Sequence, residues 1–171
     1  MTHTPTERPF VAYPDKRLKT AVPPVTEITE EIRTIWADMV ETMDAMPGYG
    51  LAGPQIGVMQ QLAVVDCSEE RGKAVLMANP EVLHASVQLR EHEEASPNLP
   101  GMSAVISRPR AVTVRFLNEA GEVEERDFVG LWATSVQHQI DHLNGKMYFD
   151  NLKPVKRQMF LKKAKKMGAM K

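Results

Sequence analysis

The chain has 171 residues, which is enough for one domain with a hydrophobic core and too few for two of ordinary size. Apolar residues make up 43% of the sequence and charged residues 25%, and no apolar run approaches the roughly 20 residues that span a membrane. The single cysteine, Cys67, excludes an internal disulfide, and the absence of a hydrophobic leader at the N-terminus makes the cytoplasm the expected compartment.

The first half of the chain is predicted to contain one helix and several strands. Residues 1–12 hold two prolines and show no periodicity, so we expect a loose segment. Apolar residues at three- and four-residue spacing predict an amphipathic helix from Thr26 to about Ala45, with Thr26 or Thr29 as its cap. After a turn-rich segment at 47–50, β-branched or alternating residues predict strands at Gln61–Asp66, at about Ala74–Ala78 ending before Asn79-Pro80, and at about Val82–Glu93.

The second half begins with a predicted hairpin. Its strands are Ala111–Asn118 and Val123–Val129, and its turn is Asn118–Gly121. A helix is predicted from about Gly130 to Leu143, where Asn144-Gly145 terminates it, and a last helix over about 154–167. Long strands interleaved with three well-separated helices indicate an α+β fold, and we expect residues 1–171 to form a single domain.

Charge is distributed unevenly along the chain. Residues 151–171 contain eight Lys or Arg and no Asp or Glu, which leaves 13 basic and 22 acidic residues, a net charge of −9, in residues 1–150. A basic tail on an acidic body favours an anionic partner. The alternative is a solvated C-terminal helix, because such helices often carry Lys and Arg near their ends.

The predicted helix at 130–143 carries a candidate metal-binding pair. In Gln137-His138-Gln139-Ile140-Asp141-His142 the two histidines lie four residues apart, so both imidazoles leave one helical face and can bind one metal ion. In metalloprotease helices of this pattern a Glu next to the first His takes a proton from the metal-bound water. Here that position is Gln139, which is no base near neutral pH. The pair alone is weak evidence for a metal site.

Three motifs in order resemble those of the peptide deformylase family. Residues 137–145, Gln-His-Gln-Ile-Asp-His-Leu-Asn-Gly, are similar to the family's Gln-His-Glu-x-Asp-His-Leu-x-Gly. Residues 48–55 match Gly-x-Gly-Leu-Ala-Ala-x-Gln with Gly53 in place of Ala, and residues 94–98, Glu-Ala-Ser-Pro-Asn, stand where the family has Glu-Gly-Cys-Leu-Ser. The resemblance covers about residues 10–167. It implies the peptide deformylase fold, with mixed sheets around the central helix and a basic helix at the C-terminus.

The resemblance also implies a metal-binding set. Members of the family hold Fe²⁺, Zn²⁺ or Ni²⁺ with the two histidines and the cysteine of these motifs, and the corresponding residues are His138, His142 and Ser96. A thiolate is a strong anionic ligand, whereas a serine hydroxyl is neutral near pH 7. We therefore expect a weakly bound metal or an empty site.

Two further reaction positions differ from the family. Gln139 replaces the general base, and Asp141 lies about 160° around the helix from it, so Asp141 cannot take over this role. The family stabilises the oxyanion with a glutamine, here Gln55, and with the main-chain N–H of the residue after the cysteine. That residue is Pro97, which has no N–H. The ligand, the base and one oxyanion donor are thus all changed.

Other interpretations of these residues remain open. The two histidines can be relics that hydrogen-bond each other, Ser96 or water, and Gln139 can be a plain polar helix residue or a modified catalyst. Ser96 can be an ordinary hydroxyl or a nucleophile with His138 or His142 as its base. Cys67 closes an apolar strand and is interpreted as a structural thiol.

Two hypotheses for function follow. In the first, an impaired homologue binds nascent or formylated N-termini through Gly48, Gly50 and Leu51, or binds the ribosome through the basic helix at 154–167, without efficient turnover. In the second, the chain is a working deformylase in which Ser96 or a water completes the metal shell. A membrane partner is not expected, and a hydrolase of another kind has no supporting feature in the sequence.

Overall fold

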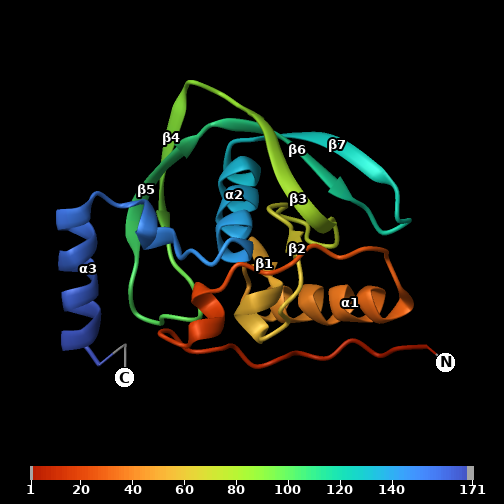
Figure 1. Ribbon diagram of the computed structural model, residues 1–171, viewed down its shortest axis with the longest axis horizontal. Coiled ribbons are helices and arrows are strands. Elements are labelled where there is room, and N and C mark those ends of the chain that lie inside the picture. The colour runs from red at the N-terminus through yellow and green to blue at the C-terminus, as the bar shows by residue number, and fades with distance from the viewer. Residues whose placement is uncertain (1, 169–171) are drawn as a thin grey trace.

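A helix at the centre of the molecule, α2 (Leu131–Leu143), organises the fold in the computed structural model, which describes residues 2–168. Strands pass on both sides of α2, α1 (Glu30–Ala45) lies below it, and α3 (Pro154–Lys166) stands apart at one edge (Figure 1). Short 3-10 turns connect these elements at Lys16–Lys19, Gly53–Ile56 and Tyr148–Asn151. The predicted α+β class is therefore confirmed.

Two sheets surround α2. The larger sheet has the order β1-β2-β3-β6-β7, and the smaller one pairs β4 with β5. The strand bounds are β1 Gly50–Ala52, β2 Leu62–Val65, β3 Val75–Ala85, β4 Leu89–Glu94, β5 Ala104–Pro109, β6 Ala111–Leu117 and β7 Val123–Val129. Where the sequence led us to expect mixed sheets, every strand pair within residues 2–168 is antiparallel.

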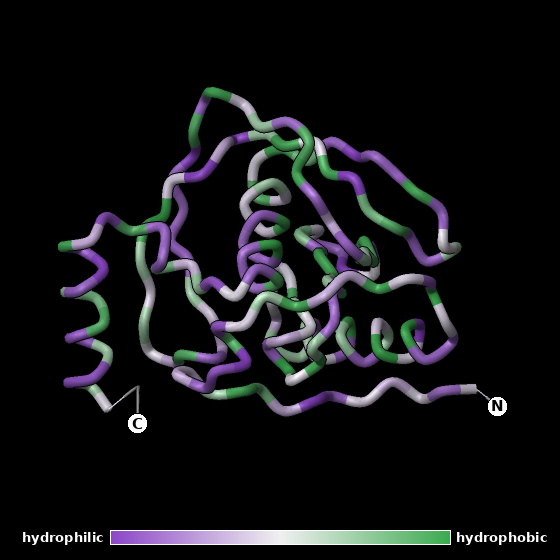
Figure 2. The backbone as a smooth tube through the Cα atoms, in the orientation of Figure 1, coloured by the Kyte–Doolittle hydropathy of each residue, from purple (hydrophilic) through white to green (hydrophobic). Residues whose placement is uncertain are grey.

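Three hydrophobic clusters fill the interior. One packs α2 against the larger sheet, and a second packs α1 against β1 and β2, with Trp36, Met39 and Met43 fully buried. The third joins Tyr148, Phe149 and Phe160, and it attaches α3 to the body. Hydrophobic residues interrupt the otherwise hydrophilic turns of α3 (Figure 2). Within the described residues, no helix has both the length and the apolar character needed to cross a bilayer.

The ends of the helices follow local sequence signals. The predicted cap Thr29 is confirmed, because its side chain accepts a hydrogen bond from the N–H of Ile32, whereas the predicted earlier start at Thr26 is wrong. The end of α2 at Asn144-Gly145 is also confirmed, with Gly145 at a φ of +77°. A Cβ on Gly145 would lie 2.9 Å from the main chain of Lys19, so this glycine lets the N-terminal loop pack on the end of α2.

The predicted strands need three corrections. Asn79-Pro80 does not end a strand: Asn79 has a φ of +52°, its side chain hydrogen-bonds Val25, and β3 continues past this bulge to Ala85. The predicted strand at 82–93 is not continuous: residues 82–85 end β3, the chain bends at 86–88, and β4 begins at Leu89. No sequence pattern predicted β1 or β5. The predictions of β2, of the β6–β7 hairpin, of α2 and of α3 are confirmed.

The N-terminal segment is fixed to α1, although it forms no helix or strand. Arg8 donates to Asp38 at 2.8 Å, and His3 hydrogen-bonds the same carboxylate at 2.7 Å. Farther along, the N–H of Val11 donates to the carbonyl of Gln55 at 2.9 Å. Because Asp38 is buried and its partners all come from this segment, residues 3–11 are anchored rather than loose.

Candidate active site

A cleft of about 260 Å³ lies beside α2 and contains most of the predicted site residues. Its walls come from the segment leading into β1, from the end of β4 and the residues after it, and from one face of α2. Gly48, Gly50, Gln55, Pro97, His138 and Gln139 all line it. The cleft therefore joins the three sequence motifs, which lie far apart along the chain.

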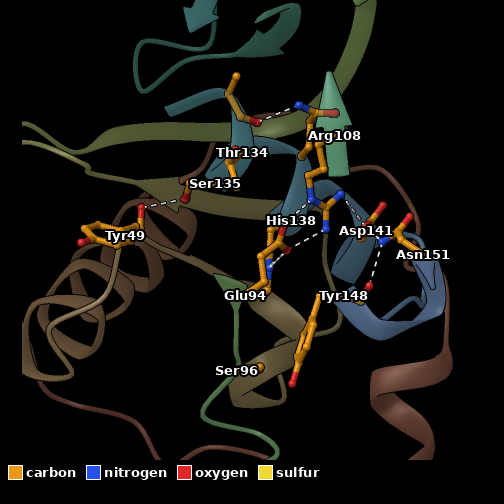
Figure 3. Close-up of polar contacts among 12 residues, drawn as sticks. Tyr49, Glu94, Ser96, Arg108, Thr134, Ser135, His138, Asp141, Tyr148 and Asn151 are labelled. Atoms are coloured by element: carbon orange, nitrogen blue, oxygen red, sulfur yellow. Dashed lines mark hydrogen bonds and ion pairs between the residues drawn. The ribbon is translucent and has the colours of Figure 1, made fainter. Parts of the chain in front are cut away.

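His138 is held in place by a buried ion network. Its Nδ1 lies 2.7 Å from Glu94 Oε1, and Arg108 donates two hydrogen bonds to the same carboxylate, at 2.7 and 2.9 Å (Figure 3). Arg108 also donates to Asp141 at 2.9 Å. Burial raises the pKa of Glu94, but hydrogen bonds from His138 and Arg108 and the guanidinium charge outweigh it, so the pKa is lowered. Glu94 is an anion that orients the ring, and the Nε2 of His138 is left for another partner.

His142 lies one helical turn after His138, and its ring makes no hydrogen bond within residues 2–168. Its exposed fraction is 1%, and neither ring nitrogen has a partner. The two rings have centroids 5.0 Å apart. Burial, and then the nearby charges of His138 and Arg108, hold the pKa of His142 well below its ordinary value. The ring is thus neutral at physiological pH, and a neutral imidazole offers a lone pair to a metal ion.

The Ser96 hydroxyl is hydrogen-bonded to Asn98 and Gln55 and not to the histidine pair. It donates to Asn98 Oδ1 at 2.8 Å and accepts a hydrogen bond from Gln55 Nε2 at 3.3 Å. No hydrogen bond joins it to His138 or His142 in the described part of the chain, so the histidine pair does not activate Ser96 as a nucleophile in this arrangement.

A divalent metal therefore finds two suitable donors here, and the third does not fit. The unpartnered His142 ring and the oriented His138 ring are typical metal ligands. Ser96 offers a neutral hydroxyl that is already hydrogen-bonded, and residues 2–168 contain no group of three or more His, Cys, Asp or Glu placed to hold a metal ion. The residues present do not fit a tightly held metal.

Gln139 lies on α2, and its buried side chain faces Gly50 of β1. Its exposed fraction is 4%, and its Oε1 has no partner in the described residues. Asp141, which lies about 160° around the helix from it, is hydrogen-bonded to Arg108 and Asn151 (Figure 3). No carboxylate on α2 is thus placed to replace the missing base.

The two positions that stabilise the oxyanion in the family are Gln55 and Pro97 in this chain, and of these two only Gln55 carries a hydrogen-bond donor. Gln55 accepts a hydrogen bond from the N–H of Ala52 at 2.9 Å and donates to Asn98 at 2.8 Å, so its side chain is fixed. Pro97 lines the cleft and, lacking an N–H, has no main-chain hydrogen to donate there.

The three predicted substrate contacts separate into two groups. Gly48 and Gly50 line the cleft, and a Cβ on Gly50 would lie 2.5 Å from Gln139 Nε2. Leu51 is fully buried in the cluster with α1, because alternate residues of a strand face opposite sides. The side chain of Leu51 therefore does not line the cleft, and contact of a peptide with its main chain on the edge strand β1 stays a prediction.

Sequence reasoning missed two residues of the site. Arg108 lies on β5, which was not predicted, and no local pattern pairs it with Glu94. Asn98 is 1% exposed and bonds both Ser96 and Gln55. The signal for Asn98 was present, because it differs from the Ser of the second family motif. The other minor position, Cys67, packs against the sheet cluster, and burial raises its pKa to about 12. This agrees with a structural thiol.

Comparisons with known proteins agree with the geometry. The family model described as polypeptide deformylase matches residues 7–158. A peptide deformylase of Acinetobacter baumannii (strain SDF) is 40% identical over 158 residues, covering 92% of this chain and 90% of the relative. One of Cellvibrio japonicus is 37% identical, covering 92% and 94%. The crystal structure of a peptide deformylase from Legionella pneumophila superposes with a TM-score of 0.86 at 36% identity, over 95% of this chain and 96% of that one.

Proposed function

The chain belongs to the polypeptide deformylase family, and we propose that it binds formylated or nascent peptide N-termini in the cleft beside α2 with little hydrolytic turnover. The reaction of the family is the removal of the formyl group from N-formylmethionyl peptides. The observation that carries the proposal is the joint state of two residues that line the cleft, Pro97 and Gln139, and of Ser96 next to Pro97. Each replaces a group with a separate role in that reaction.

The size of each loss supports impaired turnover. A general base typically contributes about 10²- to 10⁴-fold, and the Gln139 amide cannot accept the proton that a carboxylate accepts. One oxyanion donor contributes about 10²- to 10³-fold, and Pro97 cannot supply it. Ser96 weakens the metal set in addition, so the three changes affect activation of water, stabilisation of charge and retention of the ion.

The capacity to hold a peptide is supported by the strands beside the cleft. β1 forms the outer edge of the larger sheet, and β4 pairs with β5 alone, so each has main-chain groups outside its sheet pairing. An extended peptide can hydrogen-bond to such edges. Gly48 and Gly50 keep side chains out of this part of the cleft.

A second candidate is a working deformylase with an unusual metal site. The observation in its favour is the histidine pair: His142 has two unpartnered buried ring nitrogens, and Glu94 orients His138 as a metal-binding ring is usually oriented. In this alternative Ser96 or a water completes the set. It predicts stoichiometric metal in the purified protein and formate release that His138→Ala abolishes.

The test compares the parent with a variant that carries the family's residues, Ser96→Cys/Pro97→Leu/Asn98→Ser/Gln139→Glu. We expect calorimetry to show that the parent binds a formyl-methionyl peptide more tightly than its unformylated counterpart, while its formate release stays near background. The restored variant is expected to release formate, and adding His138→Ala should remove that gain.

Two outcomes would reject the proposal. Brisk formate release by the parent, lost in its His138→Ala variant, would establish the second candidate. A parent that binds neither peptide, although circular dichroism shows it folded, would remove the peptide-binding function.

We also propose an RNA partner for α3, as in ribosome docking. Five lysines of this helix are exposed: Lys156, Lys162, Lys163, Lys165 and Lys166. Phe160 and Ala164 bury the opposite face against the body. Lys171 lies outside the described residues. A helix anchored by its apolar face thus presents a basic face, which suits phosphate groups.

A further inference from the structure

Asn98 lies buried beside the cleft, at a corner where three segments meet. Its Nδ2 donates to the carbonyl of Val11 at 2.6 Å and to that of Gln55 at 3.0 Å. Its Oδ1 accepts from Ser96 Oγ and from Gln55 Nε2, both at 2.8 Å. One side chain therefore links the N-terminal segment, the turn after β1 and the loop after β4.

The orientation of both amides in this corner is determined by main-chain groups. Asn98 must turn its NH₂ toward the two carbonyls, because a carbonyl oxygen can only accept. Gln55 must turn its oxygen toward the N–H of Ala52, because an N–H can only donate. The Nε2 of Gln55 therefore faces Asn98 and Ser96, and the Oδ1 of Asn98 faces Ser96.

All polar hydrogens of this corner are consequently in use. The Gln55 amide donates to Asn98 and to Ser96, and the Ser96 hydroxyl donates to Asn98. The three side chains are 1–5% exposed. A buried and fully satisfied network is rigid, and opening it leaves unpaired groups behind.

We infer that Asn98 is a positioning residue that locks Ser96 and Gln55 into a closed hydrogen-bond network, and that this network holds the side chain at position 96 as its own member and withholds it from the histidine pair. Ser96 Oγ is engaged by three groups: it donates to Asn98 Oδ1 at 2.8 Å, and it accepts from Gln55 Nε2 at 3.3 Å and from the N–H of Asn98 at 3.4 Å. No hydrogen bond in the described residues joins it to either histidine ring. The inference rests on the proposed function in one respect, since both take Ser96 to be something other than a metal ligand.

The lock has a consequence for restoring the metal set. Ser96→Cys alone supplies the thiol but leaves the Asn98 acceptor in place, so the side chain stays hydrogen-bonded in the network and the metal set stays incomplete. Asn98→Ser removes that acceptor and introduces the residue of the family motif. The metal affinity of the cysteine variant therefore depends on residue 98, which itself offers no metal ligand in this arrangement.

Co²⁺ is the probe, because thiolate ligation gives it a charge-transfer band in the near ultraviolet. We expect Ser96→Cys to bind Co²⁺ weakly and without this band. Ser96→Cys/Asn98→Ser is expected to show the band and to bind Co²⁺ about 10- to 100-fold more tightly, the usual range for outer-shell partners of a metal site. Metal content after dialysis and calorimetric titration give the same comparison without an activity assay.

The matched control is Ser96→Cys/Asn79→Ser. Asn79 also makes two side-chain hydrogen bonds to main-chain groups, both of Val25, and it lies on β3 rather than in the cleft. It should lower the melting temperature without raising Co²⁺ affinity, which separates the lock from simple loss of stability.

The inference is overturned if Ser96→Cys alone binds Co²⁺ tightly with a thiolate band, a result that needs no substitution of Asn98 and so cannot be attributed to unfolding. Equal affinity in the single and the Asn98→Ser variants would overturn it as well. Neither outcome depends on formate release by the parent, so failure of the lock and failure of the proposed function are told apart.

Discussion

At the scale of single residues, the most demanding feature is the charged network under His138. Glu94 and Arg108 have side chains that are 3% and 6% exposed, and they form a two-point ion pair. A buried pair of this kind adds little net stability, but removal of one partner leaves an uncompensated charge in the interior. The network therefore fixes the His138 ring at the expense of tolerance to mutation.

Arg108→Met tests this network. The variant is expected to lose about 3–5 kcal/mol of unfolding free energy near neutral pH, because Glu94 remains buried without its cation. Urea denaturation measures the loss. Arg115→Met is the control: its pair with Glu81 is 46% and 63% exposed, and it should change stability by about 0–1 kcal/mol.

The loss should also depend on pH. The folded-state pKa of Glu94 lies below its ordinary value of 4.5, so its contribution to stability is present above pH 4.5 and disappears as the pH falls through the folded pKa. In Arg108→Met the burial of Glu94 dominates and raises the pKa of its carboxyl. On acidification Glu94 therefore becomes protonated at a higher pH in the variant than in the parent, and this removes the unpaired charge that destabilises the variant. The difference between parent and variant should shrink on acidification, and a difference that grows instead would contradict the ionic assignment.

The residues of the site were predictable to the extent that they belong to local motifs. Spacing on one helix places His138 and His142 together, and the motif around Ser96 adds the third position. The partners Glu94 and Arg108 lie 14 residues apart on paired strands, and one of these strands was not predicted, so no local pattern joins them. Asn98 contacts Val11 across 87 positions, which only the folded chain reveals.

At the scale of elements, the short strand β1 depends on its contact with α2. Gly50 faces that helix, where a Cβ would lie 2.5 Å from Gln139 Nε2 and 2.7 Å from Ser135 Oγ. Both side chains are held inside the protein, and Ser135 donates to the carbonyl of Tyr49 at 2.9 Å. The absence of a side chain at position 50 therefore sets the distance between strand and helix.

Gly50→Ala should push β1 away from α2. We expect a loss of about 1–3 kcal/mol of unfolding free energy, as for an overpacked contact, together with weaker binding of formyl-methionyl peptide in the cleft. Gly48→Ala is the matched control, because the added Cβ would come close to the flexible end of Met46, 2.5 Å from its Cε, and would lie at ordinary contact distance, 3.7 Å, from the main-chain oxygen of Met43. Equal stability of the two variants would show that the spacing is not set by Gly50.

The elements themselves were predictable where the pattern was long. The helices at the centre and at the C-terminus and the β6–β7 hairpin have clear periodicity and turn signals. β1 has three residues, two of which are Gly or Ala, so its strand conformation comes from pairing with β2. At Asn79 the main chain does turn, as the local sequence indicates. The strand nevertheless continues, because its pairing with β6 resumes after a bulge.

At the scale of the whole molecule, the charge separates into an acidic body and a basic helix. α3 packs through Phe160 and Ala164 on the cluster that also holds Tyr148, so the basic face is rigidly attached to the domain that bears the cleft. Deleting residues 153–171 would remove these buried side chains together with the lysines. Truncation is therefore a poor test of the helix surface, and neutralisation of exposed lysines is a better one.

The α3 proposal predicts that Lys156→Gln/Lys162→Gln/Lys163→Gln/Lys166→Gln reduces co-sedimentation with ribosomes at low salt. The slope of log affinity against log salt should fall by about one for each phosphate-contacting lysine removed. The control neutralises four exposed lysines elsewhere, Lys16, Lys19, Lys73 and Lys146, with the same change in net charge. If both variants lose binding equally, total charge rather than α3 is responsible.

The buried carboxylate beneath His138 also bears on protein engineering. Because Glu94 and Arg108 aim the ring from paired strands, its direction does not depend on which residue follows in the loop at position 96. The direction of the His138 ring and the identity of the third ligand are thus determined by separate parts of the chain. A designer can vary position 96 beside a preorganised His138 imidazole, and so screen new third ligands without rebuilding the support of that ring.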